Sequence, residues 1–161
     1  MNIFFLDLDP VVAAQYHCDK HVVKMILECA QLLYTAHWIL DPCEVPSFAY
    51  RKTHVNHPCA IWTRESIENY EWLCTLAIEL CKEFTFRYRK IHKTQTHIEW
   101  LIAHPPFNIP RTPMTPIRLA MPDEYKSTDP IESYKAFYRE SKMKQRGIVS
   151  YTKREWPMFL L

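Results

Sequence analysis

The chain has 161 residues, 48% of them hydrophobic and 14% aromatic, and its formal net charge is +2. This length suits one domain, and the apolar content is enough for one core, so a disordered chain is excluded. Because 20 basic residues face 18 acidic ones, a uniformly basic nucleic-acid binder is excluded too, and any basic surface has to be local.

Glycine and cysteine narrow the class of protein further. Gly147 is the only glycine, so neither a phosphate-binding P-loop nor a dinucleotide-binding turn can form, and tight β-hairpins are disfavoured. The six cysteines form no CxxC pair, and four of them fall within helical patterns. With no signal peptide and no apolar run of about 18 residues, we expect a cytoplasmic protein without disulfides or membrane contact.

The first predicted element is a long helix over residues 10–40. It follows "MNIFFLDLD", which suits a short strand or an extended segment. Asp9 and Pro10 form a favourable helix start, since an acidic side chain caps the helix and proline suits its first position. Asp41 ends the helix, because a residue that precedes proline is disfavoured in the helical region.

A loop over residues 41–57 leads to further helices. Pro58 begins a helical segment, and apolar residues at helical spacing continue it to about Lys90. A short helix is plausible over 94–104.

The C-terminal third divides into three parts. Residues 104–129 form a proline-rich ordered connection, because six prolines between 105 and 122 exclude a regular helix. Asp129 and Pro130 start a C-terminal helix over 130–146, and the apolar tail 147–161 docks on the core. The sequence therefore predicts one all-α domain spanning 1–161.

On a helical wheel, the predicted helix 10–40 carries a narrow polar stripe within an arc of about 100°. The stripe consists of His17, Lys20, His21, Lys24, Glu28, Gln31 and Thr35. Most of the other positions are apolar, with Asp19 and His37 as exceptions. This pattern is typical of a central helix with one polar edge open to a cleft.

The stripe supplies the candidate catalytic residues. His17 or His21 would transfer a proton near pH 7, and Glu28 would orient the imidazole or act as the acid, with Asp19 as another candidate acid. Lys20 and Lys24 would bind phosphate. The alternative is a solvated face, in which Lys24 and Glu28 form an ordinary i,i+4 ion pair.

A zinc site is a further alternative, because His17 and His21 have the i,i+4 spacing of zinc-binding helices. The third ligand would come from His54, His57, His92 or His97. The ammonium groups of the flanking lysines oppose a bound cation, so we predict neither a metal nor another cofactor.

Basic residues interleaved with aromatic residues indicate a partner with phosphates and bases. Residues 130–161 carry seven basic and three acidic residues, a local net charge of +4. The candidate contacts with nucleic acid or a free nucleotide are His57, Arg64, Asn69, Arg87, Lys90, His92, Tyr134, Tyr138 and Lys142. Alternatively, the aromatic residues belong to the core and the charges are solvated.

Four stretches resemble uncharacterised small proteins of bacteriophages and large DNA viruses. They are "CDKHVVKMILECAQLL", "NHPCAIWTRES", "LCKEFTFRYRKIHK" and "AMPDEYK" with the following "DPIESYKAFY". The resemblance implies a viral protein in the cytoplasm of the host cell.

More distantly, "AAQYHCDKHVVK" resembles the first helix of the viral pyrimidine-dimer DNA glycosylases of the endonuclease V type. The resemblance implies a single all-helical domain whose N-terminal amine attacks a sugar and whose first helix carries basic residues and a catalytic glutamate. Lys20, His21 and Lys24 match an arginine, glutamate, arginine pattern. Since His21 stands where the glutamate is expected, Glu28 or Asp19 would be the acid.

Three functions follow as hypotheses. The first is an enzyme that acts on a nucleobase or nucleotide, with DNA glycosylase and lyase chemistry of the DNA-repair type as one form. The second is a non-catalytic protein that binds nucleic acid or a nucleotide, for example to sequester a host nucleotide signal. The third is a zinc-dependent hydrolase.

Overall fold

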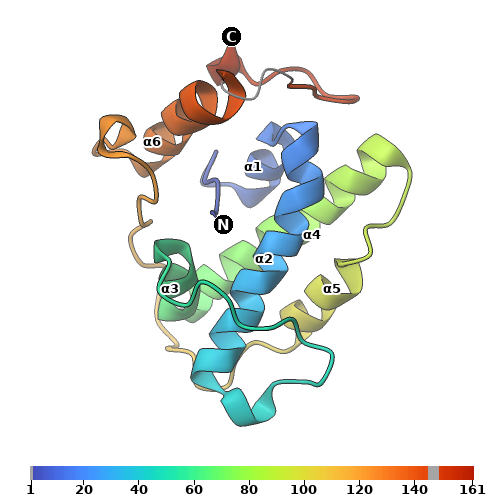
Figure 1. Ribbon diagram of the computed structural model, residues 1–161, viewed down its shortest axis with the longest axis vertical. Helices are drawn as coiled ribbons and strands as arrows, with labels where there is room; N and C mark the ends of the chain where they lie inside the picture. Colours follow the sequence, from blue (N-terminus) through green and yellow to red (C-terminus); the bar gives the residue numbers. More distant parts are fainter. Residues whose placement is uncertain (1, 145–148) are drawn as a thin grey trace.

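Two long helices, α2 (Asp19–Leu40) and α4 (Ile67–Tyr88), pack side by side at the centre of the molecule (Figure 1). The structure is a computed structural model that describes residues 2–144 and 149–161, and these residues contain helices but no strand. The prediction of an all-α fold is therefore confirmed.

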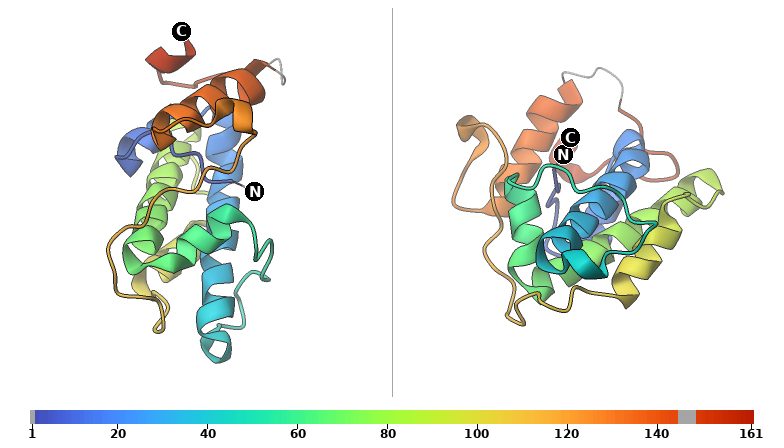
Figure 2. Two further views of the ribbon diagram at one scale, coloured as in Figure 1. Left: turned by 90° about the vertical axis from the view of Figure 1, so that its left-hand side faces the viewer. Right: turned by 60° about the horizontal axis from the view of Figure 1, so that its bottom comes forward.

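Shorter helices surround the central pair. α1 (Pro10–Tyr16) packs on α4, α3 (Pro58–Glu65) packs on both central helices, and α5 (Gln95–Ala103) does the same. α6 (Pro130–Phe137) continues as a π-helix over Tyr138–Met143 and lies with the C-terminal tail at the end of the molecule that holds α1 (Figures 1 and 2). Three-residue 3₁₀ turns occur at Pro42–Glu44, Asp123–Tyr125 and Met158–Leu160.

The helix starts that the sequence predicts are present. The Asp9 carboxylate accepts a hydrogen bond from the backbone N–H of Val11, and Asp129 caps α6 in the same way. Each acid precedes a proline at the first helical position. These caps depend only on neighbouring residues, because each acid bonds to an N–H group in the first turn of its own helix that the helix leaves unpaired.

The prediction of an unbroken helix over 10–40 is wrong. The backbone is extended at His17 and Cys18, so α1 ends at Tyr16 and α2 begins at Asp19. Distant side chains satisfy the two helix ends: Arg87 donates to the carbonyl of His17, and the Tyr138 hydroxyl accepts from the N–H of Cys18. The break therefore depends on tertiary contacts that a helical wheel does not include.

The helical region predicted from Pro58 to Lys90 also divides in two. Ser66 is extended, at φ −153° and ψ 157°, and its hydroxyl accepts a hydrogen bond from the N–H of Asn69. This cap starts α4, which ends at Tyr88, before Arg89 in the left-handed region at φ 55°.

The N-terminal segment is extended and runs through the core rather than along the surface (Figure 1). Ile3, Phe4, Phe5 and Leu6 are all buried. The Phe5 ring contacts Trp62, Trp72 and Tyr134, so the segment joins α3, α4 and α6. The start of the chain is thus held by hydrophobic burial on several sides.

The proline-rich connection runs extended over the surface and is anchored by buried polar side chains. Asn69 donates to the Thr115 hydroxyl at 2.7 Å and accepts from the Thr115 N–H at 3.0 Å. The Tyr134 hydroxyl donates to the carbonyl of Arg118 at 2.6 Å and accepts from the N–H of Ala120.

The predicted end of the last helix at residue 146, before Gly147, lies outside the described residues. The described part of the tail contacts α1, α2 and α4 through Ser150, Tyr151 and Arg154. Among residues 2–144 and 149–161, each helix is too short or too polar to span a membrane.

Candidate functional site

Asp19, a predicted acid, lies at the start of α2 in a buried ion pair with Arg87. Asp19 Oδ1 is 3.0 Å from Arg87 Nη1, and the carboxylate also accepts hydrogen bonds from Ser150 and Thr152 in the tail. Burial alone would raise the pKa of Asp19, but the hydrogen bonds from Ser150, Thr152 and Arg87 lower it. The carboxylate is therefore held ionised by structural partners.

The guanidinium of Arg87 is likewise hydrogen-bonded to structural partners. Its guanidinium donates to Glu83 at 2.9 Å and to the carbonyls of Gln15 and His17, which end α1. Glu83 also accepts from Arg154 of the tail. The predicted phosphate ligand Arg87 thus holds α1, α2, α4 and the tail together, and no phosphate reaches a side chain so fully buried.

His17 lies in the break between α1 and α2 and is fully buried. Its Nδ1 is 2.6 Å from the carbonyl oxygen of Ala13, while Nε2 has no hydrogen-bond partner among the described residues. Burial lowers the pKa of His17 to about 4, although the bond to Ala13 opposes the shift. The imidazole is neutral at pH 7.

His21 is buried on α2 beside His17. Its ring stacks on Phe4 at a centroid distance of 5.0 Å, and its Nδ1 is 2.8 Å from the Tyr138 hydroxyl oxygen. That oxygen also accepts from the N–H of Cys18, so the Tyr138 hydroxyl joins His21 to the start of α2. Both histidines therefore lie in an aromatic cluster and not on an open polar edge.

The solvent side of α2 retains three members of the predicted stripe. Lys20 is exposed. The Lys24 ammonium lies 3.4 Å from Glu28, with side chains 51% and 14% exposed. Spaced four residues apart, the three side chains share one side of the helix. This remnant, Lys20, Lys24 and Glu28, is called the α2 charged edge below.

The start of the chain lies beside α2 and α3. The Cys59 thiol donates to Asn2 Oδ1 at 3.2 Å, and the Cys59 sulfur accepts from the N–H of Ile3 at 3.3 Å. The Asn2 side chain also donates to the carbonyl of Ala120 in the proline-rich connection. Burial raises the pKa of Cys59 to about 11, so the thiol stays protonated and acts as a structural donor.

His57 connects this region with the α2 charged edge. It caps α3, with Nδ1 accepting from the N–H of Cys59 at 3.1 Å. Burial lowers the pKa of His57, the positive charge of the amino terminus lowers it further, and the charge of Glu28 opposes both. Since Nδ1 is an acceptor, the neutral ring carries its proton on Nε2 and can donate it. The Glu28 carboxylate and the amino terminus thus both act electrostatically on the His57 imidazole.

The other predicted contacts are spread over the molecule. Arg64 donates to the carbonyl of Val55, and His92 bonds to the carbonyl of Val23 through Nε2. Lys90 is exposed after the end of α4. The side chain of Lys142 lies outside the described residues. Asn69, Tyr134 and Tyr138 are buried and hold backbone groups.

The helical spacing behind the zinc alternative is not present. His17 lies in the helix break and His21 on α2, and Ala13 and Tyr138 occupy their Nδ1 atoms. Within the described parts of the chain, 2–144 and 149–161, no three His, Cys, Asp or Glu side chains are grouped so that they could hold a metal ion.

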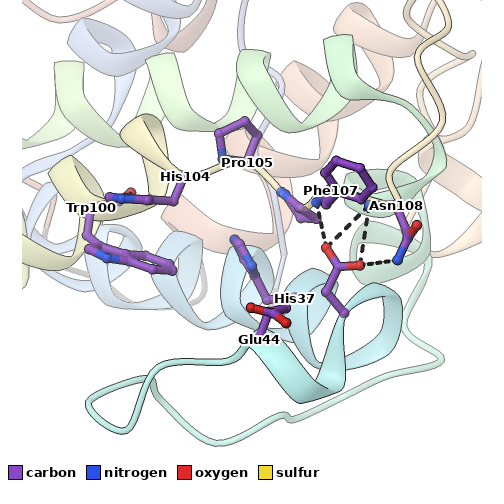
Figure 3. Close-up of a pocket in the computed structure, with 9 residues that line it drawn as sticks. His37, Glu44, Trp100, His104, Pro105, Phe107 and Asn108 are labelled. Carbon is purple, nitrogen blue, oxygen red and sulfur yellow. Dashed lines mark hydrogen bonds between the residues drawn. The ribbon is translucent and has the colours of Figure 1, made fainter.

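A pocket that no sequence pattern indicated lies at the C-terminal end of α2 (Figure 3). It has a volume of about 520 Å³, and its walls include His37, Asp41, Trp100 and His104. His37 was noted only as a polar exception on the wheel. The i,i+4 spacing of His37 and Asp41 places them on one side of the helix end, but α5 and the segment after it contribute the remaining wall.

In comparisons with known proteins, no family model, no curated protein and no solved structure matches the chain. The resemblance to the viral glycosylases and its residue matches therefore stay an expectation.

Proposed function

We propose that the protein is an enzyme that acts on a nucleobase, in DNA or in a nucleotide, by glycosylase-type chemistry at the chain start. The observation that supports the proposal is that Asn2 bonds to Cys59, two residues from His57, and that the charges of the amino terminus and of Glu28 both act on the His57 imidazole. Glu28 is the proton-transfer group, because it is the half-buried carboxylate of this region and, unlike Asp19, is not enclosed by tail contacts.

The proposed reaction uses the amino group at the start of the chain as the nucleophile. Its nitrogen forms a bond to the sugar carbon C1′ while the bond from C1′ to the base breaks, and the base leaves with the electron pair and a proton. The amine provides both protons: one leaves with the base, and as the sugar ring opens the Glu28 carboxylate takes the second from the nitrogen and passes it to the ring oxygen, which leaves an imine between the nitrogen and C1′. Lys20 and Lys24 contact the flanking phosphates.

The test compares Glu28→Gln with Glu79→Gln on duplex oligonucleotides that contain a pyrimidine dimer or an abasic site. Glu79 is a matched control, because it forms an ion pair with Lys82 on α4 and its side chain is 18% exposed. We expect strand cleavage or base release by the wild type, a rate loss of about 100-fold or more for Glu28→Gln, and less than about 2-fold for Glu79→Gln. Equal rates for the Glu28 variant and the wild type would contradict the assigned role.

A second candidate function is nucleotide or nucleic-acid binding without turnover. It is favoured by one observation: the histidines expected to transfer protons, His17 and His21, are buried in packing contacts. In this case Lys20→Ala with Lys24→Ala weakens binding and reduces its salt dependence, whereas Lys82→Ala on α4 does not. Binding with no base release over the same concentration range supports this candidate over the enzyme.

A further inference from the structure

The pocket at the end of α2 is a built cavity separate from the chain start. His37 lies nine residues beyond Glu28 on α2, so the two regions are about 13 Å apart along the helix axis. The cavity volume of about 520 Å³ falls in the range of small-molecule sites. Its function is therefore independent of the proposed reaction at the chain start.

Asp41 forms the floor of the pocket, and its carboxylate is fixed in place. It accepts from the backbone N–H of Phe107 at 2.5 Å and of Asn108 at 3.3 Å, and from the Asn108 side-chain amide (Figure 3). These neutral donors orient the carboxylate without cancelling its charge. Glu44, exposed on the 3₁₀ turn that follows α2, adds a second carboxylate to the wall.

No basic side chain balances these two acids. The pocket walls contain neither lysine nor arginine, and within the described residues neither Asp41 nor Glu44 forms an ion pair with one. A phosphate group would meet two carboxylates here at close range, which is electrostatically unfavourable. The pocket is therefore suited to a cation and unsuited to a nucleotide phosphate.

His37 contributes a neutral wall. Its Nε2 is 3.0 Å from the Tyr70 hydroxyl, and that hydroxyl donates to the carbonyl of Leu101 at 2.8 Å. The Tyr70 oxygen must therefore accept the Nε2 proton of His37. Burial lowers the pKa of His37 to about 4, more than the Asp41 charge raises it. At pH 7 the imidazole adds no positive charge to the pocket.

The opposite wall is a stack of aromatic rings, in which Trp100 lies against both His104 and Tyr34. The rings of Trp100 and His104 stack at a centroid distance of 4.5 Å and an angle of 16°. Phe107, 82% exposed, also lines the pocket. Aromatic faces of this kind attract both flat rings and cations.

From this geometry we propose that the pocket binds a small molecule in which a protonated amino or amidino group is attached to a flat ring. The ring lies against the exposed His104 ring, which is stacked on Trp100, and the cationic group points to the carboxylates of Asp41 and Glu44. The pocket thus acts as a site for an organic cation at the end of α2 remote from the tail.

The probe is benzamidine, a ring with a protonated amidine, and the charge-reversed control is benzoate. Binding is followed by two-dimensional NMR of the Trp100 indole N–H during titration at pH 7. The variants are Glu44→Gln and the control Glu124→Gln, since Glu124 is also an exposed acid in a three-residue 3₁₀ turn. Unchanged melting temperatures confirm that both variants are folded.

We expect a saturable shift with benzamidine at about millimolar concentration, at least about 5-fold weaker binding for Glu44→Gln, and less than about 2-fold change for Glu124→Gln. Benzoate gives no saturable shift. The proposal is overturned if benzamidine gives none either, if benzoate binds as tightly, or if Glu44→Gln binds like the wild type. Because the readout is binding, this result is independent of catalysis at the chain start.

Discussion

Asp19 and Arg87, 68 positions apart in the sequence, form a buried ion pair at 3.0 Å that joins the start of α2 to the end of α4. The same carboxylate binds Ser150 and Thr152 of the tail, and the same guanidinium binds the last carbonyls of α1. Two residues that the sequence suggested for catalysis and phosphate binding are thus central to the architecture.

Asp19→Asn is expected to destabilise the protein by about 3 kcal/mol, because it removes one partner of a buried ion pair and leaves the Arg87 charge less compensated. Urea unfolding followed by circular dichroism measures the change in the free energy of unfolding. Hydrogen exchange at the Thr152 amide, which donates to Asp19, is expected to accelerate.

The control for that experiment is Glu79→Gln, which removes an exposed i,i+3 pair with Lys82 and is expected to cost less than about 0.5 kcal/mol. If Asp19→Asn costs no more than this control, the ion pair does not hold the tail and helix ends together.

His17 predicts a pH dependence of stability. Its folded pKa of about 4 lies below the ordinary value of 6.5, so below pH 6.5 the unfolded chain binds a proton that the folded chain does not. The contribution of His17 to stability is therefore constant above about pH 6.5, falls as the pH decreases toward 4, and levels off below it. Between pH 7 and pH 5 the expected loss from His17 is about 2 kcal/mol.

In the variant His17→Leu, the part of the stability loss that comes from His17 is expected to be absent. In His104→Leu, a change at an exposed position, that part is expected to remain. Urea unfolding at pH 7, 6 and 5 measures the difference. Parallel curves for the wild type and His17→Leu would show that the imidazole is not buried in its neutral form.

Tyr134→Phe is expected to destabilise the protein by about 1 to 2 kcal/mol, because the carbonyl of Arg118 and the N–H of Ala120 lose their shared partner. Tyr88→Phe is the control, since no hydrogen bond of the Tyr88 hydroxyl is formed within the described residues. Faster hydrogen exchange at Ala120 in the Tyr134 variant alone would locate the loss in the proline-rich connection. Equal exchange in both variants would exclude this anchoring role.

Helix ends that depend on neighbouring residues could be predicted from the sequence. Asp9 with Pro10, and Asp129 with Pro130, start helices where expected, and α2 ends at Leu40 before Asp41. The start of α4 could also have been predicted from neighbouring residues, because Ser66 stands three residues before Asn69, where its hydroxyl can cap the helix. The helical spacing of apolar residues on both sides of Ser66 concealed that signal.

The candidate site could be predicted only in part, because the break after Tyr16 depends on Arg87 and Tyr138. Because the helix is broken, residues before and after the break cannot be placed on one helical wheel. His17 and His21 lie instead in the core beside Phe4. The pocket at His37 was missed for a similar reason. Its aromatic wall is contributed by α5 and the segment after it, more than sixty residues along the chain.

Borohydride trapping tests whether the amino group at the start of the chain is the nucleophile of a base-releasing enzyme. The protein is mixed with a dimer-containing or abasic duplex, any imine is reduced, and the adduct is located by peptide mass spectrometry. We expect a covalent adduct on the N-terminal amine in the wild type, much reduced in Glu28→Gln and retained in Glu79→Gln. No adduct, or an adduct on an internal lysine, would contradict it.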